Sequence, residues 1–296
     1  MTHHAIKTPV GIIGVGNMGG GMAANLLAQG WPVHVRDLDP VKEQNFKRIG
    51  AVAHTSPAQL AIGCEVIIVC VVDAAQTREV LFGTDGAAAA MRPGQVAMLC
   101  PTIAPQDVEV FAAELAERGL QTIDAPMSGG PVRASDGSMS LMVACPDEVF
   151  ERHRALLEAL SNKLFRISQR LGDGARTKLV NNLLAGINLA GAAEVLALAA
   201  RMGLDLGRTL DVIEQSSGQS WIGSDRMRRA ITGDFAPRAH TTLLAKDTRL
   251  ALAAAQAAGF EPALGRIAAG TFARALDAGL ADEDDASVFK LLSRPD

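Results

Sequence analysis

The sequence predicts an α/β protein in which an N-terminal doubly wound, mostly parallel sheet is followed by an all-α C-terminal domain. Two observations lead to this fold class. Short apolar runs alternate with helical segments as far as residue 165, the pattern of parallel strands joined by crossover helices. Beyond that point no strand pattern recurs, and residues 172–204 are proline-free and rich in alanine and leucine. Between Lys178 and Arg201 the only charged residue is Glu194, so we expect a long helix buried nearly all round.

Length and composition indicate a globular protein of two domains. At roughly 150 residues per domain, 296 residues predict two, which we place at 1–165 and 166–296. A hydrophobic fraction of 48% and a charged fraction of 20% are typical of such proteins, and a net charge of -4 gives no reason to expect nucleic acid or a membrane as partner. The N-terminus lacks a signal-peptide pattern, and four scattered cysteines form no CxxC motif. We therefore expect a cytoplasmic protein with reduced core cysteines and no metal site.

The first strand–helix–strand unit carries the strongest motif. An apolar strand at 10–13 runs into Gly14-Val15-Gly16-Asn17-Met18-Gly19, which is followed by a helical run at 20–29 and a second strand at 33–35. In such a motif the first glycine permits a tight turn, the second lets the backbone approach a pyrophosphate, and the third lets the helix pack on the strand. The free N–H groups at the helix start bind the phosphates. The order predicts a Rossmann-type dinucleotide-binding domain.

The residue that closes the second strand bears on the choice of dinucleotide. Asp37 would accept hydrogen bonds from the ribose hydroxyls, which favours NAD because a carboxylate repels a 2′-phosphate. The neighbouring Arg36 leaves the alternative open, since an arginine there could pair with that phosphate.

The alternation of elements continues and nominates further cofactor residues. Residues 56–62 predict a short helix, with Ser56 as its cap. The uninterrupted apolar run at 65–72 is typical of a strand buried on both faces of a parallel sheet. Another strand is predicted at 95–99, then a helix at 106–119. Residues just past such strands line the ligand crevice or serve only as core and turn. The cofactor candidates are Val71, Val72, Gln76 and Thr102.

A glycine-rich loop follows the next predicted strand, at 121–124. Its sequence is Ala125-Pro126-Met127-Ser128-Gly129-Gly130-Pro131, and composition alone favours a flexible turn. The functional alternative is a cradle in which the Ser128 hydroxyl and the following N–H groups hold a carboxylate. A turn at Asp136-Gly137 then leads into a strand at 140–143, a hairpin-like addition to the sheet.

The long helix carries candidate catalytic residues near its start. It opens with Gly172-Asp173-Gly174, a loop whose small residues would let a ligand come close to the backbone. Lys178, Asn181 and Asn182 share one helix face because they are three or four residues apart. Lys178 is either an end-of-helix lysine whose head reaches water or a partly desolvated general acid/base. The length would suffice for a membrane span, but the asparagines and Glu194 count against one.

Taken in order, these motifs resemble one family over essentially the whole chain. DAPMSGG at 124–130, GDGARTKLVNN at 172–182 and Lys246-Asp247, together with the opening nucleotide motif, are similar to the β-hydroxyacid dehydrogenases. That family includes 3-hydroxyisobutyrate and tartronate semialdehyde dehydrogenases. The resemblance implies oxidation of a small hydroxy acid by hydride transfer to NAD.

The resemblance also implies residue roles. Lys178 corresponds to the catalytic lysine and Asn182 to its companion. Substrate contacts are implied for Ser128, Gly129, Gly130 and Asn181, and cofactor contacts for Thr102 beside the nicotinamide and for Lys246, which closes over it. Two positions depart from the pattern. Cys100-Pro101 stands where the family has a serine before the threonine, and His240 stands near the cofactor lysine, where it could touch substrate or cap a helix.

Substrate identity depends on weaker signals. Ser220-Trp221, Arg226-Met227, Gly233-Asp234-Phe235 and Glu283-Asp284-Asp285-Ala286 are similar to the branch that acts on L-threonate, a four-carbon sugar acid. The alternatives are that Trp221 is packing bulk and that the acidic run 282–285 is a solvated face. We therefore predict a sugar-acid substrate, with 3-hydroxyisobutyrate dehydrogenase or tartronate semialdehyde reductase as alternatives.

Three rival functions fit the sequence less well. A 6-phosphogluconate dehydrogenase needs a longer C-terminal region, and by resemblance an imine reductase lacks Lys178. A non-enzymatic dinucleotide-binding module would not need Lys178, Asn182 and Ser128 together.

The long helix also predicts self-association. Small side chains would let a helix of a second subunit approach closely, giving a homodimer or homotetramer, unless helices from Leu206 onward cover this one within the chain. The small residues are Ala185, Gly186, Ala190, Gly191, Ala192 and Ala193.

Overall fold

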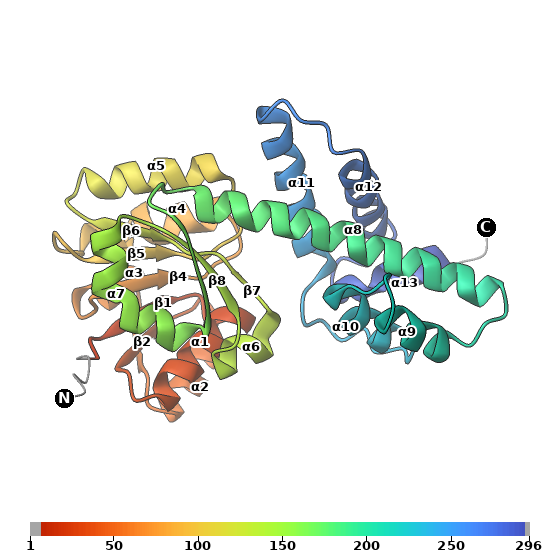
Figure 1. Cartoon of the computed structure of the whole chain (residues 1–296). Helices are drawn as coiled ribbons and strands as arrows, with labels where there is room; N and C mark the ends of the chain where they lie inside the picture. Colours follow the sequence, from red (N-terminus) through yellow and green to blue (C-terminus); the bar gives the residue numbers. More distant parts are fainter. Residues whose placement is uncertain (1–6, 294–296) are drawn as a thin grey trace, which may run out of the picture. The chain divides into compact units, whose positions relative to one another are not determined.

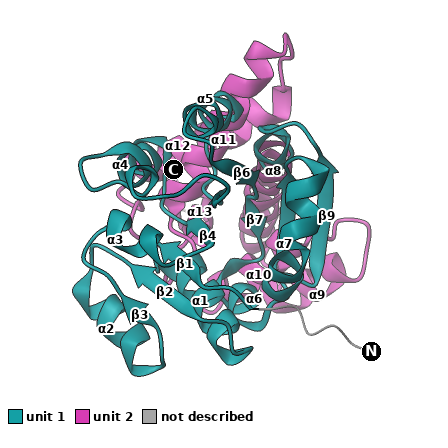
Figure 2. Cartoon of the chain, turned by 90° about the vertical axis from the view of Figure 1, so that its left-hand side faces the viewer, with its two compact units in different colours: residues 1–178 teal, residues 179–296 magenta. Residues whose placement is uncertain are grey.

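The computed structural model describes residues 7–293, which form two compact units divided between Lys178 and Leu179 (Figures 1 and 2). Residues 1–6, on which part of the signal-peptide expectation rests, lie outside the described residues. The boundary expected at 165/166 falls inside strand β9 (Lys163–Ser168), and the division between the units falls inside helix α8 (Asp173–Arg201). β9 is half-exposed and contains charged residues, so its full length cannot be recognised as an apolar run in the sequence.

The first unit is built on a mostly parallel sheet, as predicted. The order is β3-β2-β1-β4-β5-β6-β8-β7, with β9 paired in parallel to β8. Because the chain moves from β1 outward to β3 and then returns to β4 on the other side of β1, the order reverses between β1 and β4. The strands are β1 (Val10–Ile13), β2 (Val33–Arg36), β3 (Val52–Ala53), β4 (Val66–Val69), β5 (Val96–Leu99), β6 (Gln121–Asp124), β7 (Met127–Ser128), β8 (Ser140–Ala144) and β9.

Helices cover both faces of this sheet. Ile68 of β4 belongs to one apolar core and Ile67 to another, so β4 is buried on both faces, as its apolar run predicted. Ser56 caps its helix by accepting from the N–H of Gln59 at 3.2 Å, also as predicted. The helices are α1 (Asn17–Ala28), α2 (Pro40–Arg48), α3 (Pro57–Ile62), α4 (Ala74–Phe82), α5 (Pro105–Ala116), α6 (Gly130–Asp136) and α7 (Asp147–Leu160).

The segment after β6 has the expected turn at Asp136-Gly137 and the added strand, but a helix precedes the turn. β7 and β8 do pair antiparallel, but α6 lies between them, so the connection is a helix that ends at Gly137 in the left-handed conformation (φ 73°). The seven-residue helix is too short for a periodic pattern to reveal it.

The second unit is helical, as predicted: the regular elements described within 179–293 are all helices. Its core joins Leu189 and Leu196 of α8 to Met227, Leu244 and Phe272 from three other helices. The helices after α8 are α9 (Leu206–Glu214), α10 (Trp221–Ala230), α11 (Thr241–Ala257), α12 (Ala263–Asp277) and α13 (Val288–Ser293), with short 3-10 turns at Ala87–Ala89 and Asp285–Ser287.

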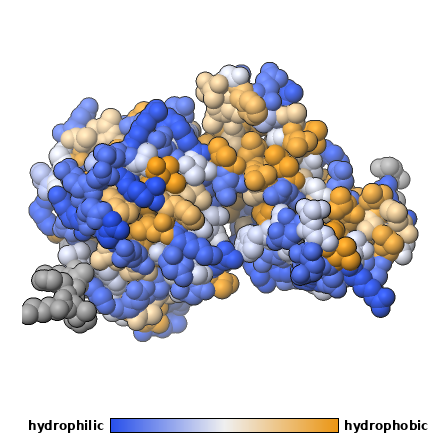
Figure 3. Space-filling model, viewed as in Figure 1, coloured by the Kyte–Doolittle hydropathy of each residue, from blue (hydrophilic) through white to orange (hydrophobic). Residues whose placement is uncertain are grey.

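Within one chain, α8 is not buried nearly all round, so that expectation was wrong. Its length and hydropathy would suit a membrane span, and only 33% of its most apolar window is buried. Exposed apolar residues recur every three or four positions or at multiples of that spacing, so they lie on one stripe. The stripe consists of Val180, Leu184, Val195, Leu198 and the adjoining Met202. Figure 3 shows further apolar residues over α11 and α12, where Phe260, Leu264 and Ile267 are exposed.

Candidate active site

The glycine loop after β1 has the geometry that its motif predicts. Gly14 has φ 90°, and a Cβ there would lie 2.6 Å from the carbonyl oxygen of Cys70. A Cβ on Gly19 would lie 2.0 Å from the Gly14 oxygen, so only glycine lets α1 pack this closely. Around Gly16 there is open space, because a Cβ there would have nothing within 4 Å. These three environments fit a turn, a packing contact and a backbone left clear for a pyrophosphate. Asn17 is exposed at the start of α1, and Met18 packs against the core.

Asp37 lies against this same loop. Its Oδ2 accepts from the N–H of Val15 at 2.8 Å, and its Oδ1 accepts from the N–H of Asp39 at 2.9 Å. The neighbouring Arg36 forms an ion pair with Glu43 at 2.8 Å. An acid therefore stands beside the glycine loop, while the adjacent arginine is already paired with a carboxylate.

The remaining predicted cofactor residues follow strands β4 and β5. A Cβ on Gly14 would lie 3.3 Å from the Val71 side chain, which places Val71 beside the glycine loop where the strand order reverses. The N–H of Val72 donates to Gln76 Oε1 at 3.0 Å, so Gln76 holds the backbone at the end of this strand. Thr102 is half-buried just past β5. The structure therefore gathers the ends of β1, β4 and β5 at one edge of the sheet.

The Ser128 segment is a strand end followed by a helix start, and not a flexible turn. Ser128 is half-buried and pairs with Ser140 across β7 and β8. Gly129 has φ 133° and Gly130 has φ 76°, backbone conformations that residues with a side chain rarely adopt. A Cβ on Gly129 would come within 2.9 Å of Arg133, whereas around Gly130 there is open space. The backbone is thus fixed in a shape that leaves one side of Gly130 clear.

Lys178 lies in the second turn of α8 and is only 7% exposed. The alternative of an end-of-helix lysine with its head in water therefore fails.

The Gly172-Asp173-Gly174 segment, whose small residues were expected to admit a ligand, receives a carboxylate of the chain itself. Asp124, at the end of β6, approaches it instead: Oδ2 accepts from the N–H of Gly172 at 2.9 Å and of Ala175 at 3.1 Å. A Cβ on Gly174 would lie 2.9 Å from this carboxylate. Burial raises the pKa of Asp124 to about 7, opposed by these hydrogen bonds.

In the second unit a hydrogen-bond network fixes the asparagine pair. Asn181 Nδ2 donates to Asn182 Oδ1 at 3.0 Å, and Asn182 Nδ2 donates to Asp247 Oδ2 at 2.6 Å. Lys246 Nζ lies 3.2 Å from Asp247 Oδ1. Asp247 thus orients Asn182 and pairs with Lys246. The sequence motif contains both Lys246 and Asp247, but it indicated a role only for the lysine.

Three weaker candidates also have defined positions. Trp221 is half-exposed and lines a cavity of about 380 Å³ with residues of α9, α10 and the loop before α11. His240 occupies the N-cap position of α11, but its ring lies 3.1 Å from the Asp282 carbonyl instead of capping the helix. Asp284 and Asp285 are buried and pair with Arg229 and Arg226, so a solvated face is wrong for this pair.

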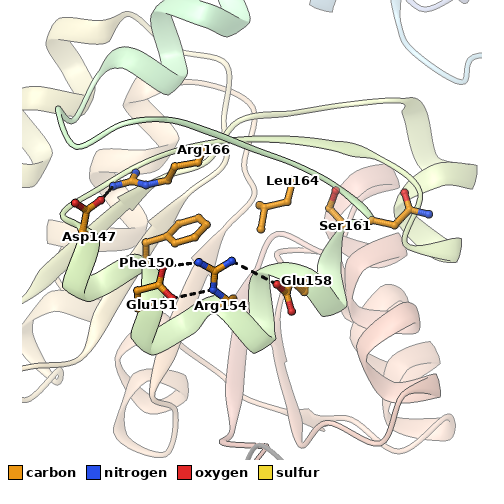
Figure 4. A pocket seen from close by; sticks show the side chains of 9 residues that line it. Asp147, Phe150, Glu151, Arg154, Glu158, Ser161, Leu164 and Arg166 are labelled. Atoms are coloured by element: carbon orange, nitrogen blue, oxygen red, sulfur yellow. Dashed lines mark hydrogen bonds and ion pairs between the residues drawn. The ribbon is translucent and has the colours of Figure 1, made fainter.

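A larger cavity, of about 500 Å³, is lined by residues of α7, of β9 and of the turn between them in the first unit (Figure 4). Arg154 lies between Glu151 and Glu158, and both Arg154 and Arg166 stack on the ring of Phe150. Both arginines of this cavity pair with carboxylates that line it, and no predicted site residue is among its lining residues.

The cysteines lie where the sequence predicts. All four are free, and three of them are buried. Burial raises the pKa of Cys64 and Cys70 to about 12 and that of Cys145 to about 11, so these three side chains remain thiols.

Comparison with known proteins gives matches along the chain. The family described as the NAD binding domain of 6-phosphogluconate dehydrogenase matches residues 9–168. The family described as NAD-binding of NADP-dependent 3-hydroxyisobutyrate dehydrogenase matches residues 172–292. The chain is 40% identical to L-threonate dehydrogenase of Cupriavidus necator, over 95% of each chain. It is 37% identical to 3-hydroxyisobutyrate dehydrogenase of Pseudomonas aeruginosa, over 90% of this chain and 91% of that one. A crystal structure of 3-hydroxyisobutyrate dehydrogenase from Salmonella typhimurium is similar, with TM-score 0.91 and 38% identity, over 96% of this chain and 99% of that one.

Proposed function

The chain belongs to the β-hydroxyacid dehydrogenase family of NAD(P)-dependent oxidoreductases, and on that premise we propose that it oxidises a sugar acid such as L-threonate. The observation that carries the proposal is a buried lysine, Lys178, in the unit that also holds the Ser128 segment and the glycine loop. Relatives named L-threonate dehydrogenase, 35–40% identical over nearly the whole chain, support this substrate class. The names of the 3-hydroxyisobutyrate relatives support the second candidate, a 3-hydroxyisobutyrate dehydrogenase.

In the proposed mechanism Lys178 Nζ takes the proton of the substrate hydroxyl. The C–H bond of the carbon that bears this hydroxyl breaks at the same time, and its hydrogen leaves as hydride. Ser128 and the backbone of Gly129 and Gly130 hold the substrate carboxylate. The cofactor, NAD, would supply the hydride acceptor when bound. In the reverse direction Lys178 returns the proton.

Asn182 lies one helical turn beyond Lys178 on α8, and its proposed role is to orient the reacting groups. Asp247 holds one hydrogen of its amide, at 2.6 Å, and Asn181 occupies its carbonyl oxygen. These two hydrogen bonds fix the orientation of the Asn182 amide and therefore of its second N–H hydrogen. We propose that this hydrogen is donated to the substrate oxygen or to the lysine head. Asn181 itself is exposed and remains a proposed substrate contact. Lys246 is the proposed cofactor contact on α11.

We infer that NAD is preferred to NADP. Asp37 lies against the glycine loop, where it would accept from the ribose hydroxyls, and a 2′-phosphate there would meet a carboxylate. The ion pair with Glu43 supports the inference, because it engages Arg36.

The test is an assay of reduced-nicotinamide absorbance with NAD and a panel of hydroxy acids. We expect the highest kcat/KM with L-threonate or a related sugar acid. The highest value with 3-hydroxyisobutyrate or with tartronate semialdehyde in reverse would select those alternatives. Lys178→Ala should lower kcat by about two to four orders of magnitude, the usual contribution of a positioned acid/base, with NAD binding retained. A change of only a few-fold would refute the lysine assignment.

We also propose that a second copy of the chain covers the apolar stripe of α8, in a homodimer or homotetramer acting in the cytoplasm. The stripe extends along much of a helix of 29 residues. Single exposed apolar residues are normal on a protein surface, but a contiguous row of them indicates an interaction surface. Asn181 and Glu194 are exposed on the same helix, and polar groups of this kind are costly against lipid. Sedimentation at micromolar concentration tests this, and a single species near 30.9 kDa would refute it.

A further inference from the structure

Asp124 is a buried carboxylate that the proposed mechanism does not use. It is the last residue of β6 and is 1% exposed. β5 flanks it in parallel, with Leu99 as partner, and β8 flanks it antiparallel, with Ala144 as partner. Four residues further along the chain is Ser128. Its position is therefore fixed by the sheet on both sides, a short distance before the proposed substrate cradle.

The carboxylate is directed at the start of α8. The first N–H groups of a helix have no partner within it, and a negative charge there is favoured by the helix dipole. Asp124 Oδ2 supplies the partner for Gly172 and Ala175, residues about 50 positions away in the chain. Gly174 is needed for this approach, since a Cβ would lie 2.9 Å from the carboxylate and 2.8 Å from the Met142 oxygen.

Helix capping alone does not require this arrangement. Serine, threonine, aspartate or asparagine next to the helix caps it locally, without burying a charge. The neighbouring Asp173 is already engaged with the hydroxyl of Ser168 at 2.8 Å and with Arg176 at 3.1 Å. A buried aspartate on a strand instead connects two elements. Here α8 carries the proposed base, and β6 leads into the proposed cradle.

We propose that Asp124 is a positioning residue for proton transfer: by holding the first turn of α8 against the end of β6, it fixes Lys178 relative to Ser128. Lys178 is three residues, less than one helical turn, beyond Ala175. Short segments of chain therefore connect one carboxylate to both groups. Displacement of a reacting group by about 1 Å can cost about a hundredfold in rate, so a loose helix start would lower kcat. The proposal rests on the proposed role of Lys178.

The matched control is a second contact in the same helical turn. Arg176 of α8 pairs with Glu109 of α5 at 2.7 Å, with both side chains about one-third exposed or more. Such exposed pairs contribute little. Glu109→Gln removes a contact to the same helix start without touching the buried carboxylate.

The experiment is a double-mutant cycle on the full-length protein. Asp124→Ala should lower kcat about 10- to 100-fold, with the KM for the hydroxy acid and the affinity for NAD within about threefold. Asp124→Asn keeps one oxygen acceptor and should recover part of the loss, and it carries the same cycle if the alanine variant does not fold. Glu109→Gln should keep kcat within about twofold. In the Lys178→Ala background, Asp124→Ala should lower the residual rate by less than about threefold, because a residue that acts through Lys178 has nothing left to position.

Two results would overturn the proposal. The first is a kcat of Asp124→Ala equal to that of the unmutated protein. The second is an effect of Asp124→Ala that multiplies with that of Lys178→Ala, as expected for a general loss of structure. A strongly impaired Lys178→Ala with a multiplicative double variant would refute the positioning role alone. A nearly unimpaired Lys178→Ala would refute the lysine assignment itself, and the positioning role with it.

Discussion

Replacement of Gly174 by alanine tests how tightly the start of α8 is held. In an ordinary helix interior this change would stabilise by about 1 kcal/mol, because alanine is the better helix former. Here the added methyl carbon would lie 2.8 Å from the Met142 carbonyl oxygen and 2.9 Å from the carboxylate of Asp124. Neither neighbour can rotate away, since one is sheet backbone and the other is held by two hydrogen bonds.

The expected net effect follows from these two terms. Forced overpacking costs about 1–3 kcal/mol, and weakening a hydrogen bond to a charged group costs about 1.5–3 kcal/mol more. After the helix-propensity gain of about 1 kcal/mol is subtracted, Gly174→Ala should destabilise by about 1.5–5 kcal/mol. At about 2–4 °C per kcal/mol for a domain of this size, Tm should fall by about 3–20 °C. Turnover should fall as well, because the same turn leads to Lys178.

Thermal and urea unfolding, followed by circular dichroism, measure the change. Gly270→Ala is the control, because Gly270 is within α12 and a Cβ there would have nothing within 4 Å. That variant should be stabilised by about 0.5–1 kcal/mol. A Gly174→Ala protein as stable as the control would refute the expectation, since the close approach would then not be a constraint.

Three further predictions concern single carboxylates. Asp37→Ala should lower the preference for NAD over NADP, as the ratio of kcat/KM values, by about tenfold or more; equal use of both by the unmutated protein would indicate that Arg36 dominates. Asp247→Asn should lower kcat about tenfold by loosening Asn182, as steady-state kinetics would show, and unchanged turnover would remove Asp247 from the site. The third prediction is a pH dependence of stability. Burial raises the pKa of Asp124 to about 7, well above its ordinary value of 3.8, so the folded protein binds the extra proton and the stability from this group is lost as pH rises through 7. Between pH 6 and 8 the unmutated protein should lose about 1 kcal/mol more than Asp124→Asn in urea titrations; equal slopes would contradict the shift.

The cofactor loop could be predicted from the sequence because its requirements are local. The roles of Gly14, Gly16 and Gly19 depend on a turn, an open backbone and a helix contact within a few residues of one another. The structure has the turn at Gly14, open space at Gly16 and the close helix contact at Gly19. The apolar run of β4 likewise indicates its own burial on both faces. Such features are determined by neighbours along the chain.

What could not be predicted depends on residues far apart in the chain. The glycines at 172 and 174 resemble a ligand loop because nothing in the local sequence shows that Asp124 approaches them. The role of Asp247 is hidden for the same reason, since its partner Asn182 is 65 positions away. Self-association through α8 was predicted, but the residues of its exposed stripe were not, because composition gives the apolar content of a helix and not which of its residues one chain can cover.

The division of the chain inside α8 has a consequence for building chimaeras from relatives. Lys178 is the last residue of the first unit, and Asn182 belongs to the second, so a junction at the structural division would take this single helical turn from two parents. A junction between β9 and α8 keeps the turn intact but separates Asp124 from the N–H groups that it holds. A working exchange would therefore place the junction after residue 182 or transplant Asp124 with the helix. The activity of chimaeras joined at the structural division, between β9 and α8, or after residue 182 would show which of these contacts a chimaera must preserve.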